Sequence, residues 1–390
     1  MQMLKLAVLF AFMAVAPHAA FAVTGEKAEF KKIADDVYAF VGKRNDANAM
    51  VVVTTQGVVL VDTGNNPPET RLLQSFIKSV TDQPLRYVVI SQNHGDHQGG
   101  TPLFAPPAHV IVQDRVYKDW ATWKPYQIKA WQRRFAERAE ALKNIKPINT
   151  AISFKDRMTL HLGGKTVELI YIEDTYNPGD IAIWLPESGV MHAGFVGYKE
   201  RHPDIRPDYS HGTTWGMLKQ LEVLSALKPR VVVPAHGPLG DVTDLHALTD
   251  YLLLGREKVR TMMAKGLPLG EIETQFNMNE YKGWDRDSHY PWMAETIHRE
   301  LQGAPPQVVP ITEHTVAGTI TKIAEEGRFL TANSDAGQEI RLRNAGDTVF
   351  EGVADRSELK VGMKFTAQYM VPQGANAALG YDVMEIVVRP

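Results

Sequence analysis

The chain has 390 residues and no cysteine, and its 42 basic and 45 acidic residues leave a formal net charge of −3. This length is enough for two or three domains with buried cores. The near balance of charge, without a sustained basic run, argues against a nucleic-acid partner. Because cysteine is absent, disulfides, thiolate metal sites and a cysteine nucleophile are excluded, and any metal must be held by histidine, carboxylate, amide or phenol groups.

An apolar segment near the N-terminus is typical of a secretory signal peptide. Lys5 precedes the apolar run at residues 6–16, and Ala20, Phe21 and Ala22 form the small-x-small pattern of a signal-peptidase site. Cleavage is therefore expected after Ala22, which places the mature protein in a bacterial periplasm or outside the cell. A retained N-terminal anchor is the alternative. The run is short for a bilayer span, and no later stretch reaches the ~20 apolar residues that a span needs.

Strand and helix patterns alternate up to about residue 301. Apolar runs at 50–53 and 58–61 flank a turn at Gly57 and predict a β-hairpin. Apolar residues at helical spacing over 72–80 predict a helix, and the run at 87–90 predicts a short buried strand. The later patterns predict strands at 167–172, 181–185 and 230–233, and helices at 215–227 and 243–264. This order indicates a layered α/β domain.

Residues 115–146 form a segment rich in aromatic and basic side chains, which we interpret as an insertion over one face of this domain. Trp131, Phe135, Arg138 and Leu142 lie four, three and four residues apart, which predicts a helix with one apolar edge. Its aromatic cluster either walls a groove for an apolar or amphipathic substrate or packs as an ordinary helix face; the cluster consists of Trp120, Trp123, Tyr126 and Trp131.

A proline-rich segment at 303–312 divides the chain, because Pro305, Pro306 and Pro310 cannot continue a helix. We expect it to link a domain at 23–302 to a second domain at 313–390. The second domain has five short strand patterns, at 315–323, 329–332, 339–342, 364–370 and 381–388. They predict a small OB-like β-barrel. Its mixed charges and few aromatic residues argue against stacking on single-stranded nucleic acid.

One loop carries an unusual density of potential metal ligands. It follows the predicted strand at 87–90 and contains Gln92, His94, Asp96 and His97. Core packing does not require two imidazoles and a carboxylate within four residues, since each buried polar group must be separately satisfied. Three further segments strengthen the interpretation of this loop as a metal site: residues 59–64 with Asp62, residues 177–180, and residues 232–238 with His236.

In this order and spacing, the four segments resemble the metallo-β-lactamase-fold superfamily of hydrolases, over roughly residues 30–301. The resemblance implies an α/β (α+β) architecture, namely an αββα sandwich with metal ligands on loops at one edge of its two sheets, here followed by the small barrel. By position, His94, Asp96, His97 and His236 match metal ligands of the family. Asp62 matches an aspartate that supports the metal loop.

Three positions depart from the family pattern. Gln92 stands where the first histidine belongs, Tyr176 stands at the third histidine, and Phe195 replaces the aspartate that bridges two metals. A two-metal site needs negative charge between cations about 3.5–4 Å apart, and the carboxylate that would supply it is missing. The sequence therefore favours one metal over two.

The expected mononuclear site uses Asp96, His97 and His236, three ligands with room for water. A single Zn²⁺ there would bring bound water to a pKa near 7 and deliver hydroxide to an ester, lactone or amide carbonyl of a small molecule. Fe²⁺ suits the same ligand types. Gln92 is a weak additional ligand, Asp96 is also expected to orient the water, and Tyr176 is expected to donate a hydrogen bond to the oxyanion.

Two questions stay open at this point. Three further histidines are either substitute ligands or ordinary surface and core residues: His192, His202 and His211. Residues 210–214 also suit a cap for the helix at 215–227. The chain as a whole is either the hydrolase described above or a catalytically silent protein that binds a ligand or partner, because a fold does not carry function by itself.

Overall fold

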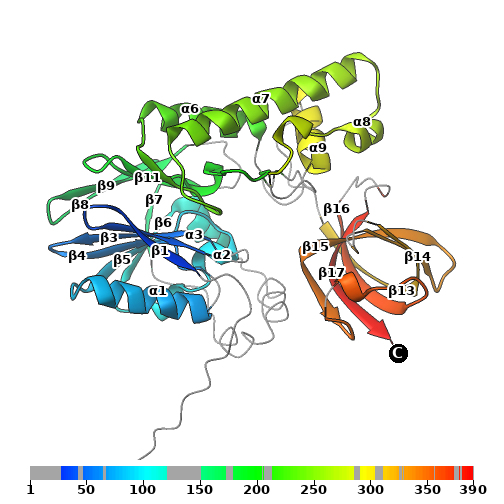
Figure 1. Cartoon of the computed structure of the whole chain (residues 1–390), viewed down its shortest axis with the longest axis horizontal. Coiled ribbons are helices and arrows are strands. Elements are labelled where there is room, and N and C mark those ends of the chain that lie inside the picture. The colour runs from blue at the N-terminus through cyan, green and yellow to red at the C-terminus, as the bar shows by residue number, and fades with distance from the viewer. Residues whose placement is uncertain are drawn as a thin grey trace, which may run out of the picture.

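The computed structural model describes residues 28–42, 47–64, 67–120, 151–172, 179–203, 205, 213–284, 290–303, 311–324, 327, 329–354, 356–372, 377 and 380–389. The predicted signal peptide and most of the predicted insertion, including Trp123, Tyr126 and Trp131, lie outside these residues. Within them, two sheets lie face to face between two layers of helices, followed by a separate barrel (Figure 1). The predicted αββα sandwich is therefore confirmed.

The first sheet follows the order of the chain. Its strands are β1 (Glu29–Ala34), β2 (Val37–Val41), β3 (Ala49–Thr54), β4 (Gly57–Val61), β5 (Leu85–Val89), β6 (His109–Gln113) and β7 (Ile152–Phe154). The first four are antiparallel, and β4 to β7 are parallel. The predicted hairpin is confirmed as β3 and β4, which turn where Thr54 pairs with Gly57. Gly57 has φ +128°, a conformation that side chains with a Cβ rarely adopt.

The second sheet has the order β12-β11-β10-β9-β8. Its strands are β8 (Arg157–Leu162), β9 (Lys165–Tyr171), β10 (Ile181–Leu185), β11 (Val190–His192) and β12 (Val231–Val233). β11 and β12 are parallel, whereas the other neighbours are antiparallel. Apolar side chains from both sheets form the central core, with Val59, Leu169 and Ile183 fully buried.

Helices cover the outer face of each sheet (Figure 1). α1 (Pro67–Val80) packs Leu73 and Ile77 against the first sheet. The second sheet is covered mainly by α6 (Thr214–Ala226) and α7 (Val242–Ala264), joined by α8 (Leu269–Gln275) and α9 (Tyr290–Leu301). Short helices are α2 (Gly95–Gln98), α3 (Asp114–Trp120), η1 (Thr101–Leu103), η2 (Gly194–Val196), η3 (Asn279–Tyr281) and η5 (Arg356–Glu358). The expected cap of α6 is present at Thr213, whose Oγ1 accepts the Gly216 N–H at 2.7 Å.

The C-terminal strands close into the predicted OB-like barrel. They are β13 (Ile311–Ala324), β14 (Phe329–Ser334), β15 (Glu339–Glu351), β16 (Lys364–Pro372) and β17 (Tyr381–Arg389), in the order β13-β14-β15-β17-β16. β16 pairs back to β13, and β15 is parallel to β17, as in OB-folds. The first strand begins at Ile311, two residues inside the predicted linker at 303–312, because its pairing with β16 extends to Pro372.

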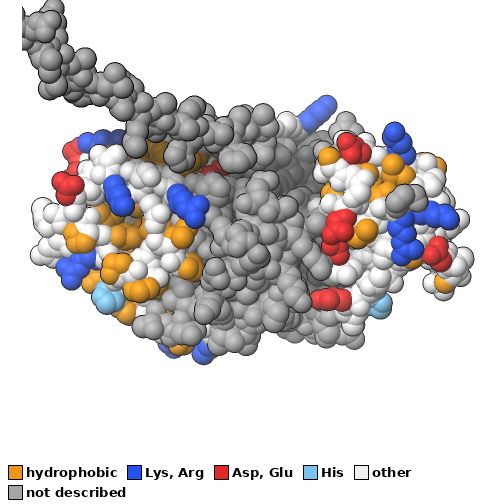
Figure 2. Space-filling view, turned by 90° about the horizontal axis from the view of Figure 1, so that it is seen from below, with side chains coloured by type: hydrophobic (Ala, Val, Ile, Leu, Met, Phe, Trp, Pro, Cys, Tyr) orange, Lys and Arg blue, Asp and Glu red, His pale blue; other side chains and the backbone are white. Residues whose placement is uncertain are grey.

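The barrel contacts the helical layer of the sandwich. The guanidinium carbon of Arg343 on β15 lies 3.9 Å from the centroid of the Trp292 ring on α9, and both side chains are buried. On the face seen in Figure 2, described basic and acidic side chains are interspersed over both parts of the molecule. No helix among the described residues is long and apolar enough to cross a membrane.

Candidate metal centre

The carboxyl ends of several strands meet at one edge of the sandwich. β4 and β5 are parallel, so Asp62 and the loop at 91–97 emerge side by side. In the second sheet, β11 and β12 are parallel, so Phe195 and His236 follow strands that end at a common edge. Loops at the carboxyl ends of strands are usual places for ligand sites in α/β folds.

This arrangement brings together Asp96, His97 and His236. One potential ligand atom from each lies within 4.8 Å of the others. Nε2 of His236 is 3.0 Å from Oδ2 of Asp96, and Nε2 of His97 is 3.9 Å from the same oxygen. The two imidazole rings stand nearly perpendicular, with centroids 5.4 Å apart. The donor atoms of the three residues that the sequence assigns to a mononuclear site therefore lie close together.

Asp62 fixes the orientation of His97 from behind this group. Nδ1 of His97 lies 2.6 Å from Oδ2 of Asp62, and both side chains are fully buried. The Asp62 carboxylate also accepts the backbone N–H of Ser91 at 2.8 Å and its hydroxyl at 2.6 Å. With Nδ1 engaged by Asp62, Nε2 is the nitrogen that His97 turns toward Asp96. Carboxylate–histidine pairs of this kind orient metal ligands in many sites.

Close backbone packing holds the loop that carries these ligands. The N–H and hydroxyl of Thr63 both donate to the carbonyl oxygen of His97, at 2.8 and 3.1 Å. A Cβ on Gly100 would lie 2.3 Å from the Thr63 carbonyl oxygen. Glycine at position 100 is therefore required for this approach of the two chain segments.

The electrostatics of the group distinguish its members. Burial acts to raise the pKa of Asp96, but the charge of His97 and the hydrogen bond from His236 outweigh it and hold this pKa well below its usual range. Burial acts to lower the pKa of His97, and Asp62, Asp96 and Asp180 together raise it. Burial lowers the pKa of His236 to about 4, against the pull of Asp96. At neutral pH, His236 is therefore an uncharged imidazole beside an ionised carboxylate.

Gln92 contacts the nitrogen that His97 would offer to a metal. Its amide Nε2 lies 2.6 Å from Nε2 of His97, and the Gln92 side chain is fully buried. When the Nδ1–H of uncharged His97 is donated to Asp62, the lone pair at Nε2 accepts a hydrogen bond from the Gln92 amide N–H. Gln92 thus lies against the metal-facing side of His97, near the predicted ligand set.

His94 and Phe195 pack against each other. Their rings meet edge to face with centroids 6.1 Å apart, and Phe195 also lies 5.0 Å from the ring of Tyr198. Phe195 is only 2% exposed. An apolar ring therefore fills the position where the family pattern has a bridging carboxylate. Tyr176, the residue at the third histidine position, lies outside the described residues.

The further histidines have separate roles. His192 is fully buried, with Nε2 3.6 Å from Oδ2 of Asp62, so it contacts the supporting aspartate. Burial lowers the pKa of His192. His202 lies 3.1 Å through Nδ1 from the Tyr251 hydroxyl, and its ring packs against Trp284, which agrees with the core interpretation. His211 lies outside the described residues.

Asn48 is a buried residue at this edge that the sequence interpretation missed. It precedes β3, and its side chain contacts the loop that carries His236. The predicted hairpin could have placed Asn48 at this edge. Met50 pairs with Val61, so counting two residues back along β3 places Asn48 level with Thr63, at the same edge as Asp62.

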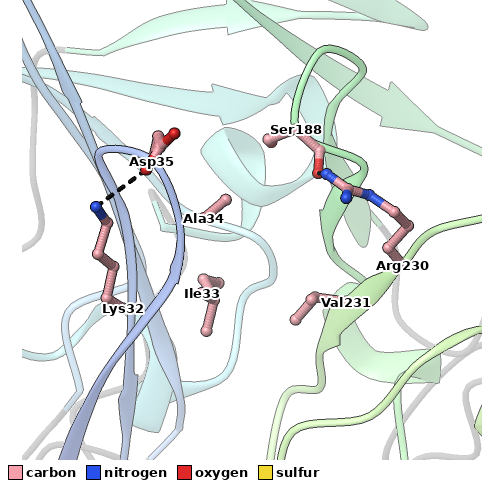
Figure 3. Close-up of a pocket in the computed structure, with 7 residues that line it drawn as sticks. All are labelled: Lys32, Ile33, Ala34, Asp35, Ser188, Arg230 and Val231. Carbon is pink, nitrogen blue, oxygen red and sulfur yellow. Dashed lines mark hydrogen bonds and ion pairs between the residues drawn. The ribbon is translucent and has the colours of Figure 1, made fainter.

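A cavity of about 460 Å³ lies at the opposite edge (Figure 3). Its walls come from the end of β1 and the following turn (residues 32–35), from Ser188, which precedes β11, and from Arg230 and Val231 at the start of β12. Lys32 pairs with Asp35 at 3.1 Å, and Arg230 donates to the Ser188 carbonyl oxygen at 2.5 Å. Because β11 and β12 run away from this cavity toward His192 and His236, it is separate from the candidate metal centre.

Comparison with known proteins identifies the family. Residues 42–236, half of the chain, match the family described as the metallo-beta-lactamase superfamily. The chain therefore belongs to this superfamily of metal-dependent hydrolases, whose members commonly bind zinc. The resemblance inferred from the loop motifs is confirmed.

Curated relatives share this family at low identity. The chain is 24% identical over 60% of its length to an atrochrysone carboxyl ACP thioesterase from Aspergillus fumigatus, covering 48% of that protein. It is 21% identical over 54% of its length to a metallo-beta-lactamase type 2 from Bacteroides fragilis, covering 79% of that protein. A linear primary-alkylsulfatase from a Pseudomonas species is 19% identical over 48% of the chain, with 40% of that protein covered. The chain thus spans about half the length of two of these relatives.

A solved structure supports the fold. The inverting sec-alkylsulfatase Pisa1 from a Pseudomonas species aligns with a TM-score of 0.54 and 16% identity, over 71% of this chain and 50% of that one. At this identity the likeness concerns the architecture alone.

Proposed function

We propose that the protein is a hydrolase with a single catalytic metal held by Asp96, His97 and His236. The observation that carries this proposal is the convergence of one carboxylate and two imidazoles, with donor atoms within 4.8 Å, on loops from both sheets. Two nitrogen donors and one oxygen donor suit catalytic zinc, which commonly keeps three protein ligands and one open position. The same donors suit Fe²⁺.

Each residue has a distinct task in this proposal. Oδ2 of Asp62 lies 2.6 Å from Nδ1 of His97 and holds the ring so that Nε2 faces the centre. His236 is uncharged at neutral pH because burial lowers its pKa to about 4, so one of its ring nitrogens carries a lone pair. The ionised Asp96 accepts hydrogen bonds and orients a water molecule for attack. A divalent cation bound at these residues supplies Lewis acidity and makes a water nucleophile available at neutral pH.

A single metal is proposed because of the surroundings of His94. Phe195, nearly fully buried, presents its ring edge-on to His94 and brings no charge to the space beside it. A second cation next to the first would need a carboxylate to screen the repulsion between them. Gln92 is a neutral amide that brings no charge to the centre, and its amide nitrogen lies 2.6 Å from His97 Nε2.

The proposed substrate is a small molecule with an ester, lactone or amide carbonyl. Relatives named as a thioesterase and a beta-lactamase support acyl transfer to water as the reaction class. Tyr176 is proposed to donate a hydrogen bond to the oxyanion. The aromatic-rich segment at 115–146 supports an apolar or amphipathic substrate. The leader-like residues 1–22 support a further proposal, that the protein acts in the periplasm or outside the cell.

Elemental analysis of the purified full-length chain tests the metal centre. We expect one zinc or iron per chain in the unmodified protein and loss of this metal in His97→Ala and His236→Ala. His109→Ala is the matched control, because His109 is an exposed histidine on β6. Absence of stoichiometric metal from the unmodified protein, after purification without chelators and incubation with Zn²⁺, would contradict the proposal.

A substrate screen separates the hydrolase from a catalytically silent binding protein. The panel consists of aryl and alkyl esters, lactones and β-lactams. We expect turnover of at least one class that a chelator abolishes and Zn²⁺ restores, with no turnover by His236→Ala. A protein that holds its metal but converts none of these compounds would instead support the binding-only alternative.

A further inference from the structure

We infer that Asn48 is a positioning residue that sets the place of His236 relative to Asp96 and thereby the affinity of the centre for its metal. This inference rests on the proposed function, because it concerns the same three ligands. Asn48 is fully buried and immediately precedes β3, far from His236 in the chain.

The Asn48 side chain forms hydrogen bonds on both sides of His236. Its Nδ2 donates one hydrogen bond to the carbonyl oxygen of Pro234 and another to that of Gly237, each at 2.9 Å. Its backbone N–H donates to the carbonyl oxygen of Ala235 at 2.8 Å. The amide group of asparagine has two donor hydrogens, so one side chain satisfies two carbonyls on either side of the ligand.

Other contacts also hold this loop. Val232 and Gly240 exchange two backbone hydrogen bonds, at 2.7 and 2.9 Å, and so join the two ends of the loop. A single parallel bridge joins His236 to Tyr198. The backbone of Gly237 has φ +89°, which turns the chain directly after His236 and points the Gly237 carbonyl toward the Asn48 amide.

The position of Asn48 makes these contacts relevant to the metal. Asp96 and His97 follow β5 of the first sheet, whereas His236 follows β12 of the second, so the ligand set spans the two sheets. Asn48 lies directly before β3 of the first sheet and donates hydrogen bonds to the loop that follows β12 of the second. The 3.0 Å separation of His236 Nε2 and Asp96 Oδ2 therefore depends on how this loop is held against the first sheet. Residues that orient ligands from outside the coordination shell commonly change metal affinity 10–100-fold.

The test uses Asn48→Asp, which keeps the size of the side chain and an oxygen to accept the Gly42 N–H, a 3.1 Å contact of Asn48 Oδ1. The substitution replaces both Nδ2 donors with an acceptor facing two carbonyls. The matched control is Asn344→Asp in the barrel, where another buried asparagine donates through Nδ2 to the Gly327 carbonyl oxygen at 2.7 Å. Asn48→Ala is the second variant, in case the new carboxylate prevents folding.

Three measurements on the full-length chain decide the matter. Competition with a chromophoric chelator should show a Zn²⁺ Kd that is 10–100-fold higher in Asn48→Asp and Asn48→Ala and within twofold of the unmodified protein in Asn344→Asp. The Co²⁺-loaded Asn48 variants should show a changed visible absorption spectrum, which reports ligand geometry. Thermal unfolding places the variants on a common stability scale. A lowered Tm with unchanged Kd and spectrum would overturn the inference.

Hydrogen exchange of the metal-free chain tests the role of Asn48 independently of metal binding. Peptides covering residues 234–237 should exchange faster in Asn48→Asp than in the unmodified protein, and they should be unchanged in Asn344→Asp. If the unmodified protein takes up no metal, the proposed function fails, while faster exchange still supports a role for Asn48 in holding the loop. Unchanged exchange in a folded Asn48 variant would overturn that role whether or not the protein binds metal.

Discussion

Nδ1 of His97 and Oδ2 of Asp62 lie 2.6 Å apart, and neither side chain exposes any surface to solvent. This pair joins the end of β4 to the loop after β5. Because the two strands are parallel, both residues lie at the same edge of the sheet, and Asp62 can orient the His97 ring. The Ser91 N–H and hydroxyl also donate hydrogen bonds to the Asp62 carboxylate. A ligand held in this way needs little reorganisation when a cation binds, because its ring is already directed at Asp96.

Asp62→Ala should therefore weaken both metal binding and the fold. We expect the Zn²⁺ Kd to rise 10–100-fold, because the His97 ring loses its partner. We also expect the free energy of unfolding to fall by about 3 kcal/mol, since one member of a buried pair is left alone. Asp35→Ala is the control, because Asp35 pairs with Lys32 at an exposed position and should change stability by less than about 0.5 kcal/mol. Chelator competition and urea denaturation measure the two effects.

His236 makes the metal-free protein sensitive to mild acid. Its pKa is about 4 in the folded chain, whereas an ordinary unfolded histidine titrates near 6.5. Between these values the unfolded chain binds more protons than the folded chain, so stability falls as the pH drops from about 6.5 to 4. A difference of this size corresponds to about 3 kcal/mol. Asp96, whose pKa is lowered, adds a loss of stability in the same direction at more acidic pH.

Replacement of His236 by glutamine, which does not titrate, should flatten this dependence. We expect urea denaturation of metal-free His236→Gln at pH 7.0, 5.5 and 4.5 to show a shallower decline in unfolding free energy than the unmodified protein. His109→Gln, at an exposed position on β6, should keep the original slope. Equal slopes in His236→Gln and the unmodified protein would show that His236 is not the group that titrates.

The sequence predicted the parts of the fold and site that depend on local patterns. The apolar runs at 50–53 and 58–61 could form only a hairpin around Gly57, and β3 and β4 are that hairpin. The loop at 91–97 and His236 could be assigned to one site because each follows a predicted strand and the order of the motifs resembles the family. Their approach to within 4.8 Å follows from the shared edge of the two sheets.

The contacts that the sequence did not predict are made between residues far apart in the chain. The side chain of Asn48 binds the His236 loop across 186 and 189 residues of sequence, and no local pattern indicates those partners. Gln92 was identified as a substituted ligand, but the sequence did not predict the contact of its side chain with His97. The structure was also needed to show that the Phe195 ring packs on His94.

The proposal of a single metal rests on the Phe195 ring that packs beside His94. Phe195→Asp returns a carboxylate to the position beside His94, and we expect metal occupancy to rise above one per chain. Phe195→Ala is the control, because it opens the same space without a ligand and should leave occupancy at one. Elemental analysis and mass spectrometry under native conditions give both numbers. An occupancy that stays at one in a folded Phe195→Asp protein would show that the loops have diverged too far to hold a second cation.

Gln92 contacts the His97 nitrogen that the proposed centre needs for its metal. Its amide nitrogen lies 2.6 Å from His97 Nε2, so a cation must displace this hydrogen bond before it can use the nitrogen. Loss of a hydrogen bond of about 1 kcal/mol corresponds to roughly fivefold in an equilibrium constant, and Gln92→Ala should therefore bind Zn²⁺ about fivefold more tightly. The control is Gln98→Ala, which removes a buried glutamine amide that donates to the Asn93 carbonyl oxygen instead. Weaker binding by Gln92→Ala would instead identify the amide oxygen of Gln92 as a ligand, since its removal would then cost the centre a donor.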